Sequence, residues 1–185
     1  MIILDNVTKK FGKKRILNSF SLTVQKGESV AVMGPSGSGK TTLLRIMAGL
    51  ERCDKGSVQA PVCAVVFQDP TLLDWLTALE NVSLVTDNSE ENAKRLLGKL
   101  GFTEDDMNKK PPELSGGMKQ RVSIARALNF SADCYLFDEA FKGLDDELRF
   151  SVISTVKEEI KGKTAVFVTH SLDEANKLGT RIITV

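Results

Sequence analysis

The chain has 185 residues, 42% of them hydrophobic, and its 25 basic and 24 acidic side chains leave a net charge of +1. This length suits one domain with a buried core, and the charge balance gives no reason to expect nucleic acid as a partner. The single histidine argues against a zinc site built from cysteines and histidines.

The first part of the chain is predicted to be rich in β-structure. Strands are expected at 2–8, 16–24, 29–33 and 62–67, and a helix at 40–49. A polar turn at 9–15 separates the first two strands, which should pair as an antiparallel β part. Its basic side chains fit a solvated hairpin face better than a lipid or nucleic-acid patch.

The middle of the chain changes character at about residue 71. Helical patterns are expected at 77–86, 90–100 and 116–128, with the polar segment TEDDMNKKPP between the last two. We interpret this stretch as a helical subdomain, residues 71–129, inserted between the two halves of a sheet domain. Residues 1–70 and 130–185 form the predicted core.

The last part of the chain alternates strands with helices. Strands are expected at 133–137, 164–169 and 181–185, and helices at 146–161 and 171–178. Such alternation predicts an α/β fold with a mainly parallel sheet covered by helices.

Residues 34–41 fit the phosphate-loop pattern G-x-x-x-x-G-K-[ST] and lie between a predicted buried strand and a predicted helix, as in P-loop NTPases. Glycines let backbone N–H groups curl around a phosphate, and a helix start favours an anion. Lys40 should reach the β- and γ-phosphates, and Thr41 should ligate Mg²⁺. The nucleotide-binding residues expected here are Gly34, Pro35, Ser36, Gly37, Ser38, Gly39, Lys40, Thr41 and Thr42.

Two carboxylates follow the apolar strand at 133–137. Asp138, at the tip of a buried strand beside the phosphate loop, can hold Mg²⁺. Glu139 would then polarise the attacking water as a general base. The alternative is an ordinary acidic turn after a strand.

Residues 114–121, LSGGMKQR, resemble the LSGGQ signature of the ATP-binding-cassette (ABC) ATPases. The other family motifs occur in the family's order over nearly the whole chain. They are the phosphate loop, Gln68, the signature, Asp138-Glu139, Leu144-Asp145 and His170. The resemblance implies ATP and Mg²⁺ as ligands, residues 1–70 and 130–185 as a nucleotide-binding core, and ATP hydrolysis coupled to transmembrane transport.

The resemblance also implies roles for single residues. Phe11 occupies the place of an aromatic that stacks on adenine, although packing in the turn is the alternative. Gln68 corresponds to a glutamine that senses Mg²⁺ and the attacking water, or else it is a polar residue ending a strand. His170 would contact the γ-phosphate and Glu139, or it is a buried or capping histidine. Asp145 resembles an aspartate that works across the dimer interface.

Ser115, Gly116 and Gly117 should begin a helix whose start, in the family, meets the γ-phosphate bound by the other subunit. The resemblance therefore implies a homodimer that sandwiches ATP. Lys40, Gln68, Glu139 and His170 form the expected catalytic set.

The segment 67–82 is similar to importers for nitrate, sulfonates and taurine, which often read LLPW where this chain has Asp74 before Trp75. Trp75 lies where the membrane subunit docks in such importers, or it packs the helical lobe. This similarity implies permease subunits as partners, an extracytoplasmic solute-binding protein indirectly, and a place on the cytoplasmic face of the cell membrane.

The chain departs from the family at several positions. Ala140 replaces a frequent proline, Lys142 replaces a small residue and Met118 replaces a glutamine. The link 56–62 is short and is expected to lack a strand or hairpin. The early end at Val185 favours a compact subunit without a regulatory domain, or an incomplete chain.

Two other functional classes remain. A non-transport ABC ATPase acting on chromosomes, DNA repair or ribosomes is disfavoured, because the chain has a single cassette and no sustained heptads. An ATP-gated scaffold is disfavoured because Lys40, Asp138, Glu139 and His170 are all present.

Three cysteines, Cys53, Cys63 and Cys134, show no pairing pattern and predict buried free thiols in a reducing compartment. No export signal is evident, and no apolar run approaches the ~20 residues needed to span a bilayer. We therefore expect a cytosolic chain attached to the membrane through another polypeptide.

Overall fold

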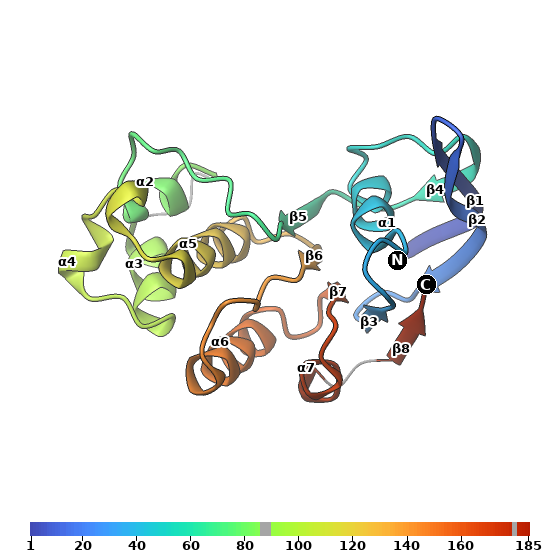
Figure 1. The fold of residues 1–185 in the computed structure, drawn as a ribbon. Helices are drawn as coiled ribbons and strands as arrows, with labels where there is room; N and C mark the ends of the chain where they lie inside the picture. Colours follow the sequence, from blue (N-terminus) through green and yellow to red (C-terminus); the bar gives the residue numbers. More distant parts are fainter. Residues whose placement is uncertain (86–89, 179–180) are drawn as a thin grey trace. The chain divides into compact units, whose positions relative to one another are not determined.

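The computed structural model describes residues 1–85, 90–178 and 181–185, and Figure 1 shows its helices and strands. The chain divides into two units. The first comprises 1–65, 133–139 and 161–185, and the second comprises 66–132 and 140–160.

The first unit begins with a three-stranded antiparallel sheet in the order β2-β1-β4. Its strands are β1 Ile2–Phe11, β2 Lys14–Val24 and β4 Lys55–Gln59. The predicted turn at 9–15 is too long, because β1 and β2 stay paired as far as Phe11 and Lys14. The expectation that the link 56–62 lacks a strand is wrong, because β4 pairs with β1 through Ile3–Gln59 and Leu4–Val58.

A five-stranded sheet in the order β5-β6-β7-β3-β8 carries the rest of this unit. Its strands are β3 Ser29–Met33, β5 Cys63–Val66, β6 Cys134–Asp138, β7 Thr164–Val168 and β8 Arg181–Thr184. The pairs β3–β7, β3–β8 and β6–β7 are parallel. Every residue of β6 and β7 is buried, which explains why both strands read as continuous apolar runs.

Helix α1 (Lys40–Met47) packs between the two sheets of the first unit and contacts β4, β6 and β7 (Figure 1). Leu43, Leu44 and Met47 are buried on the side predicted from their spacing. Side chains of β1, β2, β3, β6 and β7 join them in one apolar core. Helix α7 (Leu172–Leu178) packs against β3.

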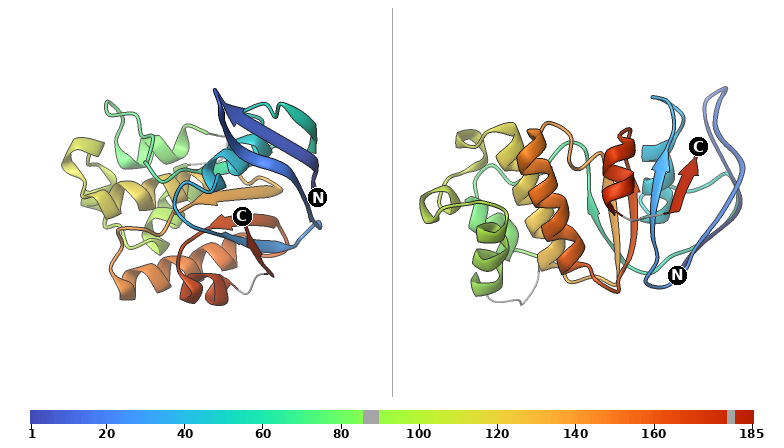
Figure 2. Two further views of the ribbon diagram at one scale, coloured as in Figure 1. Left: turned by 45° about the vertical axis from the view of Figure 1, so that its right-hand side comes forward. Right: turned by 90° about the horizontal axis from the view of Figure 1, so that it is seen from below.

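The second unit is helical. Its elements are α2 Ala78–Ser83, α3 Glu90–Lys99, α4 Glu104–Met107, a 3₁₀ turn at Pro111–Glu113, α5 Gly116–Asn129 and α6 Asp146–Glu159. Helix α5 contacts α2, α3 and α6, and it lies alongside α6 in the right view of Figure 2. Residue 86, the predicted end of the second helix, is outside the described residues.

The predicted α/β architecture, with its parallel sheet, antiparallel part and helical segment, is confirmed. Residues 71–129 all belong to the second unit, as far as they are described, but this unit also contains α6, which was predicted with the core. The proposed boundaries of the nucleotide-binding core and helical subdomain stay a prediction. Among residues 1–85, 90–178 and 181–185, no helix has the length and hydropathy that crossing a membrane requires.

Candidate nucleotide-binding and hydrolysis site

The predicted phosphate loop connects the end of β3 to the start of α1. Gly39 precedes the helix with φ 107°, and a Cβ there would lie 2.7 Å from Ile16 Cγ2, so only glycine fits this position. No side chain caps the first turn of α1. The N–H groups of this turn are therefore available to an anion, which the helix dipole also favours.

Lys40 lies with its ammonium group over this loop. The residue is only 5% exposed, and Nζ donates hydrogen bonds to Gly34 O and Pro35 O, both at 2.9 Å. A buried ammonium group held by two loop carbonyls supplies the positive charge that a triphosphate needs. The remaining predicted loop residues, Ser36, Gly37, Ser38, Thr41 and Thr42, are half-buried or exposed.

The two residues predicted to hold Mg²⁺ in this unit are in contact. Asp138 ends β6 and is 2% exposed, and the Thr41 side chain lies close enough to its carboxylate to affect the pKa of Asp138. Burial raises the pKa of Asp138, and the interaction with Thr41 offsets part of that rise. The Oδ1 atom has no hydrogen-bond partner. A buried, unpaired carboxylate oxygen beside a hydroxyl matches the oxygen ligands that Mg²⁺ prefers.

Glu139 and His170 form the second pair. His170 Nε2 lies 2.7 Å from Glu139 Oε1. Glu139 adopts the left-handed backbone conformation, with φ 46°, and its N–H donates to Val168 O at 3.0 Å. The two residues follow the carboxyl ends of the neighbouring parallel strands β6 and β7, so they lie at the same edge of the sheet.

Phe11 ends β1 and is half exposed. The Lys9 ammonium lies 5.0 Å from the centre of its ring, and Glu51 holds this ammonium at 2.6 Å. The exposed ring offers a face for stacking, so adenine binding stays a prediction that this geometry allows.

Gln68 and Trp75 belong to the second unit and are both exposed. Gln120 of α5 donates from Nε2 to Phe67 O at 3.1 Å, which anchors the residue next to Gln68. Asn81 is fully buried, and its side chain bonds the backbone of Leu73, Leu76 and Thr77 on both sides of Trp75. These two amides support the exposed segment, and no sequence motif points to either of them.

The predicted signature residues begin helix α5. Ser115 caps it, because its Oγ accepts from Met118 N at 3.2 Å, and Ser115 and Gly116 are exposed. A Cβ on Gly117 would lie 3.1 Å from Leu144 Cδ2, so a larger residue would disturb this contact. Asp145 caps α6 through a hydrogen bond from Leu148 N at 2.9 Å, which gives this residue a structural role as well.

Comparison with known proteins decides the family. The family model described as "ABC transporter" matches residues 17–142. The chain belongs to the ABC transporter family. As an ABC ATPase, it binds and hydrolyses ATP through this α/β cassette.

The named relatives of this ABC chain are ATP-binding proteins of import or transport. It is 39% identical to the aliphatic sulfonates import ATP-binding protein SsuB 2 of Pseudomonas syringae pv. syringae (strain B728a), with 97% of this chain and 67% of the relative covered. It is 38% identical to the bicarbonate transport ATP-binding protein CmpD of Synechocystis sp. (strain ATCC 27184 / PCC 6803 / Kazusa), over 98% and 73% of the two chains.

A solved structure shares the fold of this ABC chain. It is the dimeric post-hydrolysis state of the ATP-binding cassette MJ0796 bound to ADP and Pi. The TM-score is 0.92 and the identity 33%, and the similarity covers 100% of this chain and 94% of the other. The predicted fold class and family are therefore confirmed, whereas the roles of individual site residues stay predictions.

Proposed function

We propose that this chain is the motor subunit of an ABC importer and that two copies sandwich ATP at the cytoplasmic face of the cell membrane. The relatives named above, an aliphatic sulfonates import protein and a bicarbonate transport protein, support import of a small organic or oxyanion solute. The dimeric state of the similar solved cassette supports a pair.

One observation carries the catalytic proposal. The phosphate loop, the Thr41–Asp138 contact and the Glu139–His170 contact all occur within the first unit. They follow strands β3, β6 and β7, whose carboxyl ends share one edge of a parallel sheet. Open α/β sheets bind ligands at such an edge.

These residues have complementary roles toward ATP. Backbone N–H groups of residues 34–41 and the Lys40 ammonium bind the β- and γ-phosphates. Glu139 accepts a proton from the attacking water, and His170 holds the Glu139 carboxylate in position from 2.7 Å. Thr41, Asp138 and Gln68 are the residues that would hold Mg²⁺, which when bound neutralises charge on the phosphates.

The signature supplies the part of the site that one copy lacks. Ser115 and Gly116 are exposed at the start of the 14-residue helix α5, where backbone N–H groups favour an anion. In the pair, this helix start of one copy meets the γ-phosphate bound by the other. A single copy should therefore hydrolyse ATP slowly.

The pair would act on permease subunits through the segment around Gln68 and Trp75, with a solute-binding protein outside the membrane as an indirect partner. Trp75, the only tryptophan of the chain, is 68% exposed. A large exposed aromatic on a segment held by Asn81 and Gln120 suits a docking surface.

The test of catalysis is Glu139→Gln, with Glu147→Gln in the first turn of α6 as a control. Loss of the base should lower phosphate release by about 100-fold or more. The variant should still bind MgATP and should accumulate as a dimer in sedimentation experiments. Phosphate release at the rate of the unchanged chain would remove Glu139 from the role of base.

Partner identity is tested separately, by purifying the chain from membranes under mild detergent. A permease and a solute-binding protein should copurify with it. Recovery of ribosomes or DNA in their place would contradict the importer proposal and leave the ATPase assignment untouched.

A further inference from the structure

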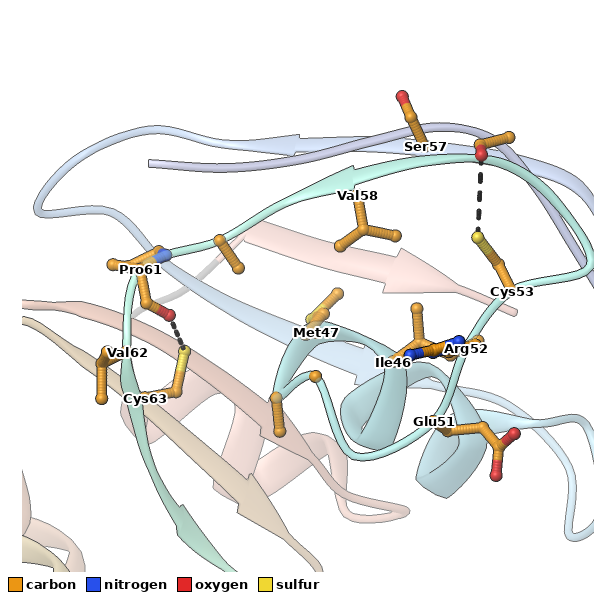
Figure 3. Close-up of a pocket in the computed structure, with 14 residues that line it drawn as sticks. Ile46, Met47, Glu51, Arg52, Cys53, Ser57, Val58, Pro61, Val62 and Cys63 are labelled. Atoms are coloured by element: carbon orange, nitrogen blue, oxygen red, sulfur yellow. Dashed lines mark hydrogen bonds between the residues drawn. The ribbon is translucent and has the colours of Figure 1, made fainter.

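A pocket of about 610 Å³ lies at the C-terminal end of α1, the end opposite the phosphate loop (Figure 3). Its wall is mostly apolar and includes Ile46, Met47, Val58 and Val62. Two cysteines also line it, and Figure 3 shows Cys53 and Cys63 at opposite ends of the pocket. Both are only partly buried, which corrects the prediction that every cysteine is buried.

Cys63 has a second thiol beside it. It begins β5, and Cys134 begins β6, the neighbouring strand of the five-stranded sheet. The two thiols lie close enough to interact, because each changes the pKa of the other. Neighbouring strands lie ~4.8 Å apart, inside the range of Cα separations, about 4.4–6.8 Å, that a disulfide bridges.

The two thiols differ in exposure and acidity. Cys134 is fully buried, whereas Cys63 faces the pocket. The interaction with Cys134 lowers the pKa of Cys63, and the same interaction together with burial raises the pKa of Cys134. When protonated, the Cys63 thiol donates to Pro61 O at 3.2 Å. The more acidic thiol is therefore the accessible one, which is the arrangement of a reactive cysteine with a resolving partner.

We propose that Cys63 and Cys134 are an oxidation-sensitive pair, in which Cys63 reduces hydrogen peroxide that enters the pocket and the two sulfurs then join as a disulfide. This site is separate from the nucleotide site and does not depend on the proposed function.

The chemistry balances in two steps. The Cys63 thiolate attacks one peroxide oxygen, the O–O bond breaks, and hydroxide leaves and takes up a proton as water. The Cys134 sulfur then attacks the Cys63 sulfenic acid, and the sulfenic OH leaves with the Cys134 proton as a second water. Two thiols are oxidised to one disulfide while one peroxide is reduced to two waters.

The full-length, folded chain is treated with hydrogen peroxide, blocked with iodoacetamide and digested with trypsin. Cleavage after lysine and arginine places the three cysteines in separate fragments, 53–55, 56–94 and 127–142. We expect fragments 56–94 and 127–142 to be joined, and dithiothreitol to release them. Cys53 should react at least about tenfold more slowly than Cys63, because its thiol donates to Gly56 O and is not paired with Cys134.

Three variants sharpen the result. Cys53→Ser, the matched control in the same pocket, should form the disulfide at the unchanged rate. Cys63→Ser should leave Cys134 unoxidised, and Cys134→Ala should accumulate a sulfenic acid on Cys63 that dimedone traps.

The proposal is overturned if fragment 53–55 is oxidised as fast as 56–94, or if these two fragments are the ones joined. It is equally overturned if Cys134 stays open to alkylation after oxidation and unfolding. The map of the unchanged chain decides the matter even where Cys134→Ala fails to fold.

Discussion

Two regions of this ABC chain, the nucleotide site of the first unit and the helix ends of the second unit, differ in how their polar groups are paired. In the first unit, Asp138 Oδ1 and Ser38 Oγ are buried without hydrogen-bond partners, and Glu139 is held at φ 46°. In the second unit, Thr77 and Thr103 close capping boxes, and Glu159 is paired with two cations. Unpaired buried groups cost stability, so the nucleotide site carries a cost that a bound ligand can relieve. The second unit gains stability from its own pairs.

The largest effect is expected at the nucleotide site of the first unit. Lys40→Ala removes the ammonium that a triphosphate would contact and should weaken ATP binding about 10- to 100-fold, because charge-assisted hydrogen bonds contribute about 1.5–3 kcal/mol. Calorimetric titration measures the affinity. Lys26→Ala, an exposed lysine of the same unit, is the control, and equal affinities of the two variants would contradict the assignment.

Asn81→Ala tests the second unit. The buried amide bonds the backbone at Leu73, Leu76 and Thr77, and its loss removes the hydrogen bonds to Leu73 N and Leu76 O, whereas Leu73 O and Thr77 O keep a backbone donor. We expect a loss of about 2 kcal/mol and a fall in Tm of about 4–8 °C. Trp75 fluorescence should also shift toward that of a free indole. Asn108→Ala, an exposed asparagine of the same unit, should change neither quantity.

Asp138→Asn tests whether the buried carboxylate lowers the stability of the first unit, so here the substitution is expected to stabilise the fold. Because burial raises the pKa of Asp138, the folded state favours the neutral form, and this carboxylate lowers stability as pH rises above its ordinary value of 3.8. The neutral amide should therefore raise stability at pH 7 by about 1 kcal/mol, or about 2–4 °C in Tm without nucleotide. Thermal unfolding measures this gain. A lower Tm would show that the carboxylate is not under strain.

The smallest effect is expected on the stability of the fold at acid pH. Hydrogen bonds from Arg95 and Lys99 lower the pKa of Glu159 from 4.5 to about 2. The pair therefore stabilises the fold above about pH 4.5 and loses this contribution as pH falls toward 2. Glu159→Gln should flatten that part of the stability curve by less than about 1 kcal/mol, since the pair is at the surface. Glu158→Gln, its more exposed neighbour, should leave the curve nearly unchanged.

The sequence predicts strands such as β3 and β6 closely because their apolar runs are buried on both faces. It does not predict β4, whose residues KGSVQ are mostly exposed and pair only at the edge of a sheet, so they show no alternation. The extent of β1 and β2 was underestimated for a related reason. The missed residues, 9–11 at the end of β1 and 14–15 at the start of β2, are mostly basic and stay extended through backbone pairing, which composition does not record.

The site shows the same division. Contiguous motifs identify the phosphate loop, Asp138 and Glu139, because local spacing determines their geometry. Gln120 and Asn81 were missed, since each acts on backbone groups that are brought near by folding and a single amide has no pattern. The contact between Cys63 and Cys134 arises from strand order, which places residues far apart in sequence side by side.

The anchoring of Trp75 has a mechanical consequence. One buried amide holds the loop at Leu73, Leu76 and Thr77 through hydrogen bonds. The loop is therefore rigid, because its two ends cannot move independently. If a permease subunit binds Trp75 as proposed, a displacement of α2 would move that subunit directly. A flexible loop would instead change its own conformation and transmit less of the motion. The efficiency of force transfer would thus depend on a residue that never touches the partner.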